Sequence, residues 1–396
     1  MRRAPFAALA ALAAFAAFAA PLVAQSRGPA PGEPLPGLTP AEFEEFRLGL
    51  DDFLEVETTG EGLGPAFNAT SCAACHNVPA IGGAGTIAEM RAGRLDASGR
   101  FQTLDPTGET LFHLFSIPTH GCHAIVPAEA NVFARRVPIP LFGAGLVEGI
   151  PDDAIAALED PSDRDRDGVS GRAARVVDAA TGERRIGRFG WKGQHATLLA
   201  FSGDAYRNEM GITNDIFSAE AAYGVTAERM RACDRVGDPE DVRDPRTQRR
   251  GIDNFTSFMR FLAPVARDLA AAGDHGAGEQ IFNAVGCAAC HHPAFTTGPS
   301  RNPLFDRRPV ALFSDLLLHD VGTGDGIVQG PAAAEEIRTP ALWGLRLRRP
   351  LLHDGSAATA EEAVRRHAGE AELARRGFEQ LPGADRAALL AFLRSL

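Results

Sequence analysis

Two short runs of cysteine and histidine carry the clearest chemistry in the sequence. Cys72-Ala73-Ala74-Cys75-His76 recurs, residue for residue, at 287–291. In a Cys-x-x-Cys-His motif, two thiols form thioethers with the vinyl groups of haem, and the histidine binds the iron from one face. The repeat therefore predicts two covalently bound c-type haems. The predicted attachment residues are Cys72, Cys75, Cys287 and Cys290, and the predicted iron ligands are His76 and His291.

The same four cysteines allow two other kinds of site, a single structural zinc site or a pair of redox dithiols. Neither kind needs a histidine directly after each cysteine pair, so haem attachment is favoured. Cys122 and Cys233 remain after these pairs are removed. In an oxidising compartment they are a candidate disulfide, and two buried free thiols are the alternative.

The first residues have the pattern of a secretory signal. Arg2 and Arg3 precede a run rich in alanine, phenylalanine and leucine, which ends at Ala24. We predict that 1–24 are a signal peptide and that the mature protein is periplasmic; a retained signal acting as an anchor is the alternative. No other apolar stretch of the sequence is long enough to span a bilayer.

The composition indicates an acidic protein with room for two or three domains. The chain has 396 residues and a formal net charge of −11 at pH 7. This balance argues against nucleic acid and anionic membranes as partners, and it is compatible with a small basic electron carrier. We expect the electron donor to be a small redox protein or a quinol-linked cytochrome.

The predicted fold class is mainly α, with two cytochrome c-like haem domains and insertions rich in loops and short strands. We predict an extended leader over 25–38, an N-terminal haem domain over 39–273 and a C-terminal haem domain over 274–396. Thr39-Pro40-Ala41-Glu42 predicts a capped helix start. The apolar stripes that should face the core are Phe43, Phe46, Leu50 and Phe53 in this helix, and Ile252, Phe255, Phe258, Met259 and Leu262 in a later one.

The C-terminal domain is predicted to contain three helices. One, from Glu279, leads into the second haem motif, and another, over 384–396, packs against it. Between them, Thr359 caps a helix whose inward stripe is Ala360, Val364, His367 and Ala371.

An aspartate-rich turn is a candidate calcium site. Asp163, Asp165 and Asp167 alternate before Gly168, as in the front half of a calcium loop. The twelfth position is Ala174 instead of glutamate. A solvated turn of aspartate and arginine is the alternative.

Several longer motifs give the chain a family resemblance. They are Gly62-Leu63-Gly64-Pro65, Gly187-Arg188-Phe189-Gly190-Trp191-Lys192, Glu209-Met210-Gly211-Ile212-Thr213-Asn214, Ser314-Asp315-Leu316-Leu317-Leu318-His319-Asp320, Arg338-Thr339-Pro340 and Leu352-His353-Asp354-Gly355. With these motifs, nearly all of the mature chain resembles the di-haem oxidoreductase family, also labelled thiol oxidoreductase. More distantly, it resembles bacterial di-haem cytochrome c peroxidases and the methylamine-utilisation di-haem enzyme.

The resemblance implies a distal ligand for the second haem. It falls on His367, fourteen residues past His353, which would itself contact a haem propionate or the backbone. A satisfied core histidine is the other interpretation of His367. For the first haem, related peroxidases take a distal histidine soon after the motif, yet none occurs between Asn77 and Phe112. An open iron face is therefore expected, with Met90, His113, His120 and Met210 as competing ligands.

The resemblance also places an acid-base residue at Glu209, with Gln194 as a possible polar partner. A carboxylate there can move a proton between the two peroxide oxygens. The alternative is a salt bridge at a helix end. Trp191 and Trp343 are the two indoles, and either can lie between the haems or in the core.

These features predict an exported di-haem oxidoreductase. Electrons would enter at the second haem and pass to the first, where hydrogen peroxide is reduced. One alternative is an electron-transfer cytochrome in which both irons are fully coordinated. Another is an oxidase that acts on a partner protein or an organic substrate.

Overall fold

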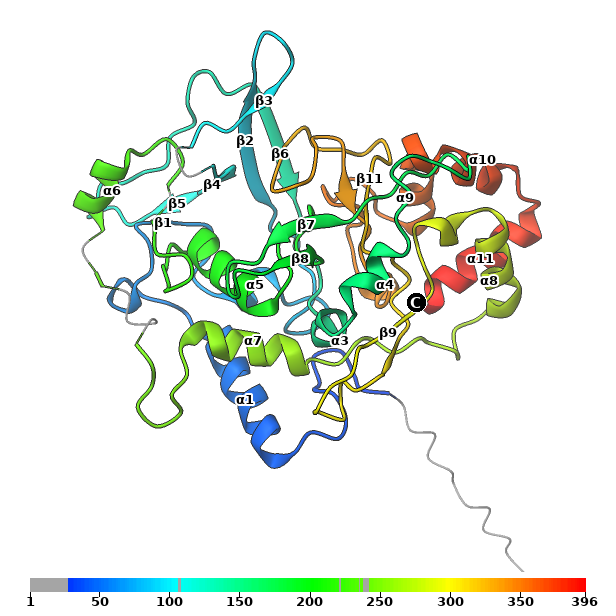
Figure 1. Ribbon diagram of the computed structural model, residues 1–396, viewed down its shortest axis with the longest axis horizontal. Coiled ribbons are helices and arrows are strands. Elements are labelled where there is room, and N and C mark those ends of the chain that lie inside the picture. Colours follow the sequence, from blue (N-terminus) through cyan, green and yellow to red (C-terminus); the bar gives the residue numbers. More distant parts are fainter. Residues whose placement is uncertain (1–27, 106–107, 221, 235, 238–241) are drawn as a thin grey trace, which may run out of the picture.

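The computed structural model describes residues 28–105, 108–220, 222–234, 236–237 and 242–396. The predicted signal peptide and the start of the leader lie outside these residues. Helices joined by long loops and short strands make up the fold (Figure 1), so the mainly helical class is confirmed. The division into domains over 39–273 and 274–396 stays a prediction.

The helices are mostly short. The longer ones are α1 (Pro40–Leu54), α5 (Leu198–Ala205), α7 (Gly251–Phe261), α8 (His275–Ala284), α10 (Glu372–Gln380) and α11 (Gly383–Ser395). The others are α2 (Cys72–Cys75), α3 (Ala144–Glu148), α4 (Asp152–Ala156), α6 (Ala227–Cys233) and α9 (Ala360–Arg366). Single turns are η1 (Thr59–Glu61), η4 (Cys287–Ala289), η5 (Leu345–Leu347) and η6 (Gly369–Ala371), and η2 (Tyr206–Met210) is a π-helix.

The strands form one small sheet and several antiparallel pairs. In the sheet, β2 (Glu89–Leu95) pairs with β3 (Phe101–Gln102), β4 (Leu111–Phe112) and β6 (Val132–Arg136). The pairs are β1 (Ala66–Phe67) with β5 (Phe115–Ser116), β7 (Ala174–Val177) with β8 (Arg184–Gly187), β9 (Phe295–Thr296) with β10 (Pro309–Val310), and β11 (Leu318–His319) with β12 (Ile337–Arg338).

Helix α1 begins as predicted. The Thr39 hydroxyl accepts a hydrogen bond from the Glu42 amide, and the Glu42 carboxylate accepts one from the Thr39 amide. Phe46 and Phe53 of α1 pack on Phe258 of α7, with ring centroids 5.4 and 4.7 Å apart. The prediction for Phe43 was wrong: it is 50% exposed, because the contacts with α7 are made further along the helix.

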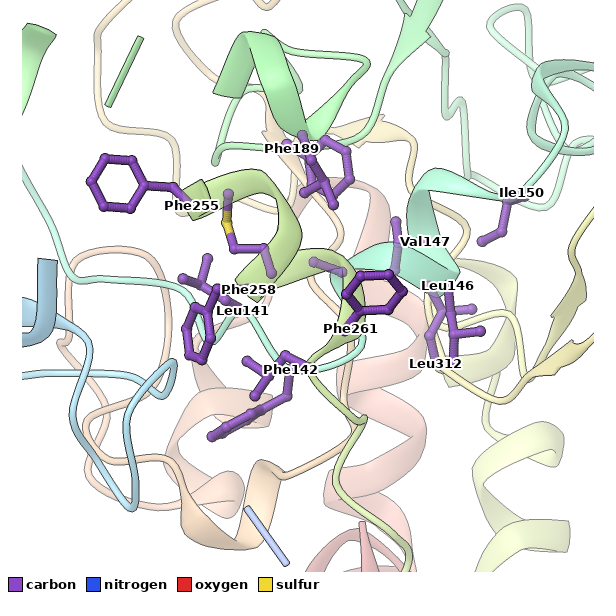
Figure 2. Packing of buried hydrophobic residues seen from close by; sticks show 14 of the residues in the cluster. Leu141, Phe142, Leu146, Val147, Ile150, Phe189, Phe255, Phe258, Phe261 and Leu312 are labelled. Atoms are coloured by element: carbon purple, nitrogen blue, oxygen red, sulfur yellow. The ribbon is translucent and has the colours of Figure 1, made fainter. Parts of the chain in front are cut away.

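The largest core cluster surrounds α7. Figure 2 shows Phe255, Phe258 and Phe261 of this helix among residues of the segment that leads into α3. The residues of the predicted α7 stripe are all buried. Leu262 has an extended backbone and ends the helix. Pro264 follows two residues later, and a proline disfavours helical backbone at the residue before it, here Ala263.

A second cluster joins the C-terminal helices. Phe282 of α8 lies 5.2 Å from Phe392 of α11 between ring centroids, which confirms the predicted packing of these two helices. The predicted helix after Thr359 was only partly right, because α9 ends at Arg366. His367 is extended and Gly369 has a positive φ of 52°, so Ala371 belongs to a separate turn, η6.

In the described part of the chain, we find no helix with both the length and the apolar character needed to cross a membrane.

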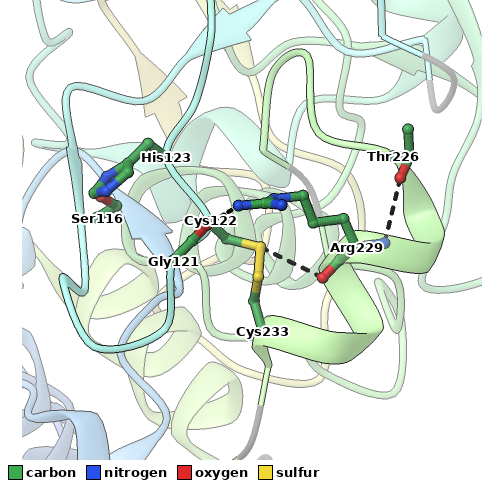
Figure 3. The surroundings of a disulfide bond; sticks show 7 residues. All are labelled: Ser116, Gly121, Cys122, His123, Thr226, Arg229 and Cys233. Atoms are coloured by element: carbon green, nitrogen blue, oxygen red, sulfur yellow. Dashed lines mark hydrogen bonds between the residues drawn. A yellow bond between two sulfur atoms is a disulfide. The ribbon is translucent and has the colours of Figure 1, made fainter.

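Cys122 and Cys233 form a disulfide, which confirms the candidate bridge (Figure 3). The bond joins the loop around Gly121 to the end of α6, and both cysteines are buried. Arg229 of α6 also donates a hydrogen bond to the Gly121 carbonyl, at 2.7 Å. The cross-link therefore holds α6 against a segment 111 residues earlier in the sequence.

We expect the paired substitution Cys122→Ala with Cys233→Ala to lower the free energy of unfolding by about 4 to 5 kcal/mol, because the unfolded chain gains the entropy of a long open loop. Denaturant unfolding of the two haem-loaded proteins measures the difference. Wild-type protein treated with a reductant should match the double variant. Equal stability of oxidised wild type and double variant would contradict this prediction.

Candidate functional site

The two cysteine motifs each lie against a cavity. Cavity 1, of about 180 Å³, is lined by Cys72, Cys75 and His76 together with Glu209 and Trp191. Cavity 2, of about 300 Å³, is lined by residues of the second motif, by Trp191 from earlier in the chain and by residues of several later segments. These are Cys287, Cys290, His291, Trp191, His319, Arg338, Arg348, His353, His367 and Glu370.

The first motif is held in one helical turn. Helix α2 contains both thiols, and His76 follows it directly. The His76 Nδ1 atom lies 2.9 Å from the Gly83 carbonyl oxygen, so Nδ1–H donates to that oxygen and Nε2 keeps its lone pair for a metal. Burial lowers the pKa of His76, which favours the neutral ligand form. Gly85 allows the following loop to pass closely, since a Cβ atom there would lie 1.9 Å from the Cys75 carbonyl oxygen.

The second motif repeats this arrangement with a different carbonyl. His291 follows η4, and its Nδ1 lies 3.1 Å from the Phe313 carbonyl oxygen. Burial, with a smaller contribution from the neighbouring His367, lowers the pKa of His291 to about 4. The imidazole is therefore neutral, with Nε2 available as a ligand atom.

His367 lines cavity 2 with His291 although it does not belong to a helix. Its Nδ1 lies 2.7 Å from the Ala363 carbonyl oxygen, and burial lowers its pKa. Three imidazoles thus share one tautomer, with Nδ1 bonded to the backbone. His353 lines the same cavity and meets the Trp191 ring edge-on at 6.1 Å between centroids.

The residues of both cavities fit haem. Each cavity offers two free thiols and a neutral imidazole, which are the donors of the c-type attachment. Each also contains a buried arginine with unpartnered nitrogen atoms among the described residues, namely Nη2 of Arg136 in cavity 1 and Nε and Nη2 of Arg348 in cavity 2. Arg136 already pairs with Asp325 at 2.7 Å, so it has one nitrogen to offer, whereas both of these Arg348 nitrogens lack a partner. A buried nitrogen of a guanidinium without a partner is costly, and a haem propionate carries the charge that would satisfy it.

Glu209 is positioned by a π-helix and two distant residues. A π-helical turn is rare and occurs frequently at functional sites. The Asn68 amide donates to Glu209 Oε2 at 3.0 Å, and the Glu209 carboxyl also hydrogen-bonds Glu89. Burial, with help from the Glu89 charge, raises the pKa of Glu209 to about 8. Arg91 pairs with Glu89 at 2.7 Å, so Glu89 is the ionised member of the two carboxyls.

Gln194 lines cavity 1, as predicted for a site residue, but it is not among the hydrogen-bond partners of Glu209. Its Oε1 accepts from the Lys192 amide at 3.3 Å. Asn68 and Glu89 occupy the expected role. Sequence analysis missed them because they lie 141 and 120 residues before Glu209. Their polar side chains were compatible with such a role, but no spacing in the sequence linked them to Glu209.

The four competing ligands for the first iron differ in position. Met210 lines cavity 1, whereas Met90, His113 and His120 are not among its lining residues. Met90 lies on β2 between Glu89 and Arg91, which do face the cavity, so strand alternation directs it to the other side. His113 Nε2 is 2.8 Å from the Asn208 carbonyl oxygen. These positions leave no histidine other than His76 on the lining of cavity 1.

Trp191 lines both cavities, and Trp343 lines neither of them. The Trp191 indole donates to the Val137 carbonyl at 2.8 Å, and the Arg348 guanidinium carbon lies 5.1 Å from its ring centroid. Trp343 packs on the main core next to Gly143. Of the two indoles, Trp191 is the one between the cavities.

The carboxylates of Asp163, Asp165 and Asp167 come within 4.8 Å of one another, and Asp167 reaches the lining of cavity 2. Calcium binding by this turn stays a prediction.

Residues 127–396 match a family model described as "Di-haem oxidoreductase, putative peroxidase". This range is more than half of the chain and includes Glu209, His367 and the second haem motif. The first motif, Cys72–His76, precedes this range. The family model therefore confirms the predicted resemblance for the larger, C-terminal part of the mature chain and does not cover the part before residue 127. No match was found among curated proteins.

Solved structures resemble the chain at low identity. A diheme peroxidase, BthA, from Burkholderia thailandensis is 16% identical, with 93% of this chain and 87% of that chain covered and a TM-score of 0.43. Kuenenia stuttgartiensis hydrazine synthase is 15% identical over 100% of both chains, with a TM-score of 0.42. A MauG-like protein associated with microbial copper homeostasis is 15% identical over 94% of this chain and 93% of that chain, with a TM-score of 0.40. At these scores the likeness supports no conclusion about function.

We expect His367→Ala to convert the second haem from a low-spin to a high-spin species, because the variant removes the imidazole that shares cavity 2 with His291. Electron paramagnetic resonance of the oxidised protein measures the change. His353→Gln is the matched control in the same cavity and should leave the low-spin signal in place. An unchanged low-spin signal in the His367 variant would refute ligation by this residue.

Proposed function

The chain belongs to the di-haem oxidoreductase family, and we propose that it is an exported di-haem c-type peroxidase that reduces hydrogen peroxide at cavity 1. The observation that carries the proposal is the difference between the cavities. Cavity 2 has a second neutral imidazole, His367, in addition to His291. Cavity 1 has Glu209 in addition to its own motif histidine. The first site therefore suits a small reactant, and the second suits electron transfer alone.

Each motif would hold one haem through its two cysteines and its histidine. When bound, haem iron supplies the redox chemistry at both sites. Arg136 and Arg348 are the residues suited to bind propionates, since their unpartnered nitrogens are buried in cavities 1 and 2. His367 would complete the second site.

Glu209 is the proposed proton carrier. As a carboxylate, it accepts the proton of one peroxide oxygen, and it returns that proton to the other oxygen as the O–O bond breaks. Two electrons and two protons then convert peroxide into two water molecules. Asn68 fixes the carboxyl through its bond to Oε2, and Glu89 supplies the neighbouring charge that opposes ionisation of Glu209.

Trp191 is the proposed link for electrons between the sites. Its ring borders both cavities, and the bond from its indole to Val137 fixes its orientation. The donor remains as predicted from the sequence, a small redox protein or a quinol-linked cytochrome that delivers electrons to the second haem.

Spectroscopy of the resting and half-reduced protein tests the open site. We expect one low-spin haem and one haem that binds cyanide, because His76 is the one histidine that lines cavity 1 among the described residues and Met210, the candidate ligand left there, would give a low-spin haem only if it bound the iron. Cyanide titration followed by electron paramagnetic resonance measures this. Two low-spin haems that do not bind cyanide at any redox level would favour the electron-transfer cytochrome instead.

We expect Glu209→Gln to abolish the pH dependence of peroxide reduction together with most of its rate. The wild-type rate should rise with pH and level off near pH 8, because the pKa of Glu209 is about 8 and the carboxylate is the form that accepts the proton. Below this pKa, the ionised fraction changes about tenfold per pH unit. Stopped-flow mixing of reduced protein with peroxide over a pH series measures both effects.

Glu89→Gln is the informative companion variant. Removal of its charge should lower the pKa of Glu209 and move the rise in rate toward lower pH. If Glu209→Gln keeps the wild-type rate and pH profile while both haems are intact, Glu209 has no proton role.

A further inference from the structure

A buried group of charged residues lies beside cavity 2 and has no part in the function proposed above. His319 of β11 is 2% exposed, and each of its ring nitrogens contacts a carboxylate. Nε2 lies 2.8 Å from Asp315 Oδ2, and Nδ1 lies 2.7 Å from Glu370 Oε2. Both carboxylates accept, so both ring nitrogens must carry protons, and His319 is an imidazolium ion. Burial alone would lower its pKa, but the hydrogen bonds to Asp315, Cys290 and Glu370 raise it well above the ordinary value.

One end of this cluster touches the segment that carries the proximal ligand. The Asp315 amide donates to the Cys290 carbonyl at 2.9 Å, and His319 Nδ1 lies 3.7 Å from Cys290 Sγ. Phe313, two residues before Asp315, supplies the carbonyl that orients His291. The segment 313–319 is thus bonded directly to the second haem motif.

The other end touches the segment that carries His367. Glu370 accepts hydrogen bonds from the Ser170 amide at 2.8 Å and the Asp320 amide at 2.9 Å, in addition to that from His319. Two backbone bonds reinforce the contact, from the Ala368 amide to Val321 at 2.8 Å and from the Glu370 amide to Asp320 at 2.9 Å.

The geometry of the turn depends on these contacts. His367 is the residue that ends helix α9. Its amide still donates to the Val364 carbonyl at 3.1 Å, but the backbone from His367 onward leaves the helix. Gly369 has a positive φ, and a Cβ atom there would lie 2.4 Å from the Asp320 carbonyl oxygen. The turn 367–370 is therefore held at its start by α9 and along the rest of its length by the segment 318–322. Glu370 is the side chain that joins them.

We propose that Asp315, His319 and Glu370 form a positioning cluster that holds His367 in place opposite His291. The inference rests on the proposed function in one respect, since it takes His367 as the distal ligand of the second haem. None of the three residues is assigned a contact with the iron. They act through the ligand-bearing segments on the two sides of cavity 2.

Glu370→Gln tests the cluster in the haem-loaded protein. Glutamine has the same shape but only one accepting oxygen, whereas three donors meet the two oxygens of Glu370. We expect the low-spin signal of the second haem to weaken, and its affinity for cyanide to rise about tenfold or more, as loss of a charged hydrogen bond would produce. Glu372→Gln is the matched control, because Glu372 lies nearby on α10 and pairs with Arg375 and Arg376. It should leave both readouts unchanged.

A double variant shows whether Glu370 acts through His367. In a His367→Ala background, Glu370→Gln should add nothing to cyanide affinity, because the ligand that it positions is gone. His319→Gln should reproduce the effect of Glu370→Gln. It replaces Glu370→Gln as the test variant if that protein does not fold. Wild-type spectra and cyanide affinity in both variants would overturn the inference while leaving ligation by His367 intact. An unchanged second haem in His367→Ala would overturn the ligation and this inference together.

Discussion

The site depends on one kind of hydrogen bond, from the Nδ1–H of a buried histidine to a backbone carbonyl. His76, His291 and His367 each make this bond, to Gly83, Phe313 and Ala363. The bond selects the tautomer, so that Nε2 carries the lone pair. Burial lowers the pKa of all three imidazoles and keeps them neutral. Each of these Nε2 atoms is therefore in the form that can bind a metal.

The sequence was most informative where the chemistry is local. A cysteine pair and its histidine fit within one turn, so their spacing alone predicted both motifs, and the structure folds each of them as a single turn. Thr39 and Glu42 form the predicted capping box for the same reason, and the stripe of α7 is buried as its period required.

Features that depend on contacts between distant segments were not predictable in this way. Gln194 was expected beside Glu209 on the basis of a family resemblance, whereas Asn68 and Glu89 are its partners. The choice between Trp191 and Trp343 likewise needed the fold, because nothing in the residues next to either indole says which of them lies near both motifs. The helix after Thr359 was extended too far because its apolar period continues to Ala371. Contacts of the turn with Asp320 and Val321 override that period.

The two cavities differ in whether the residues that line them can exchange protons. In cavity 1, two carboxyls lie close together, and the pKa of one of them is raised to about 8, so this wall can take up and release a proton near neutral pH. In cavity 2, the arginines Arg338 and Arg348 keep their charge although burial lowers the pKa of each to about 10, and His291 stays uncharged. Reduction of peroxide consumes protons as well as electrons, and Glu209 is the group in cavity 1 whose pKa suits it to exchange a proton near neutral pH. The division of labour between the haems would then follow from the side chains around them, with Trp191 as the shared boundary.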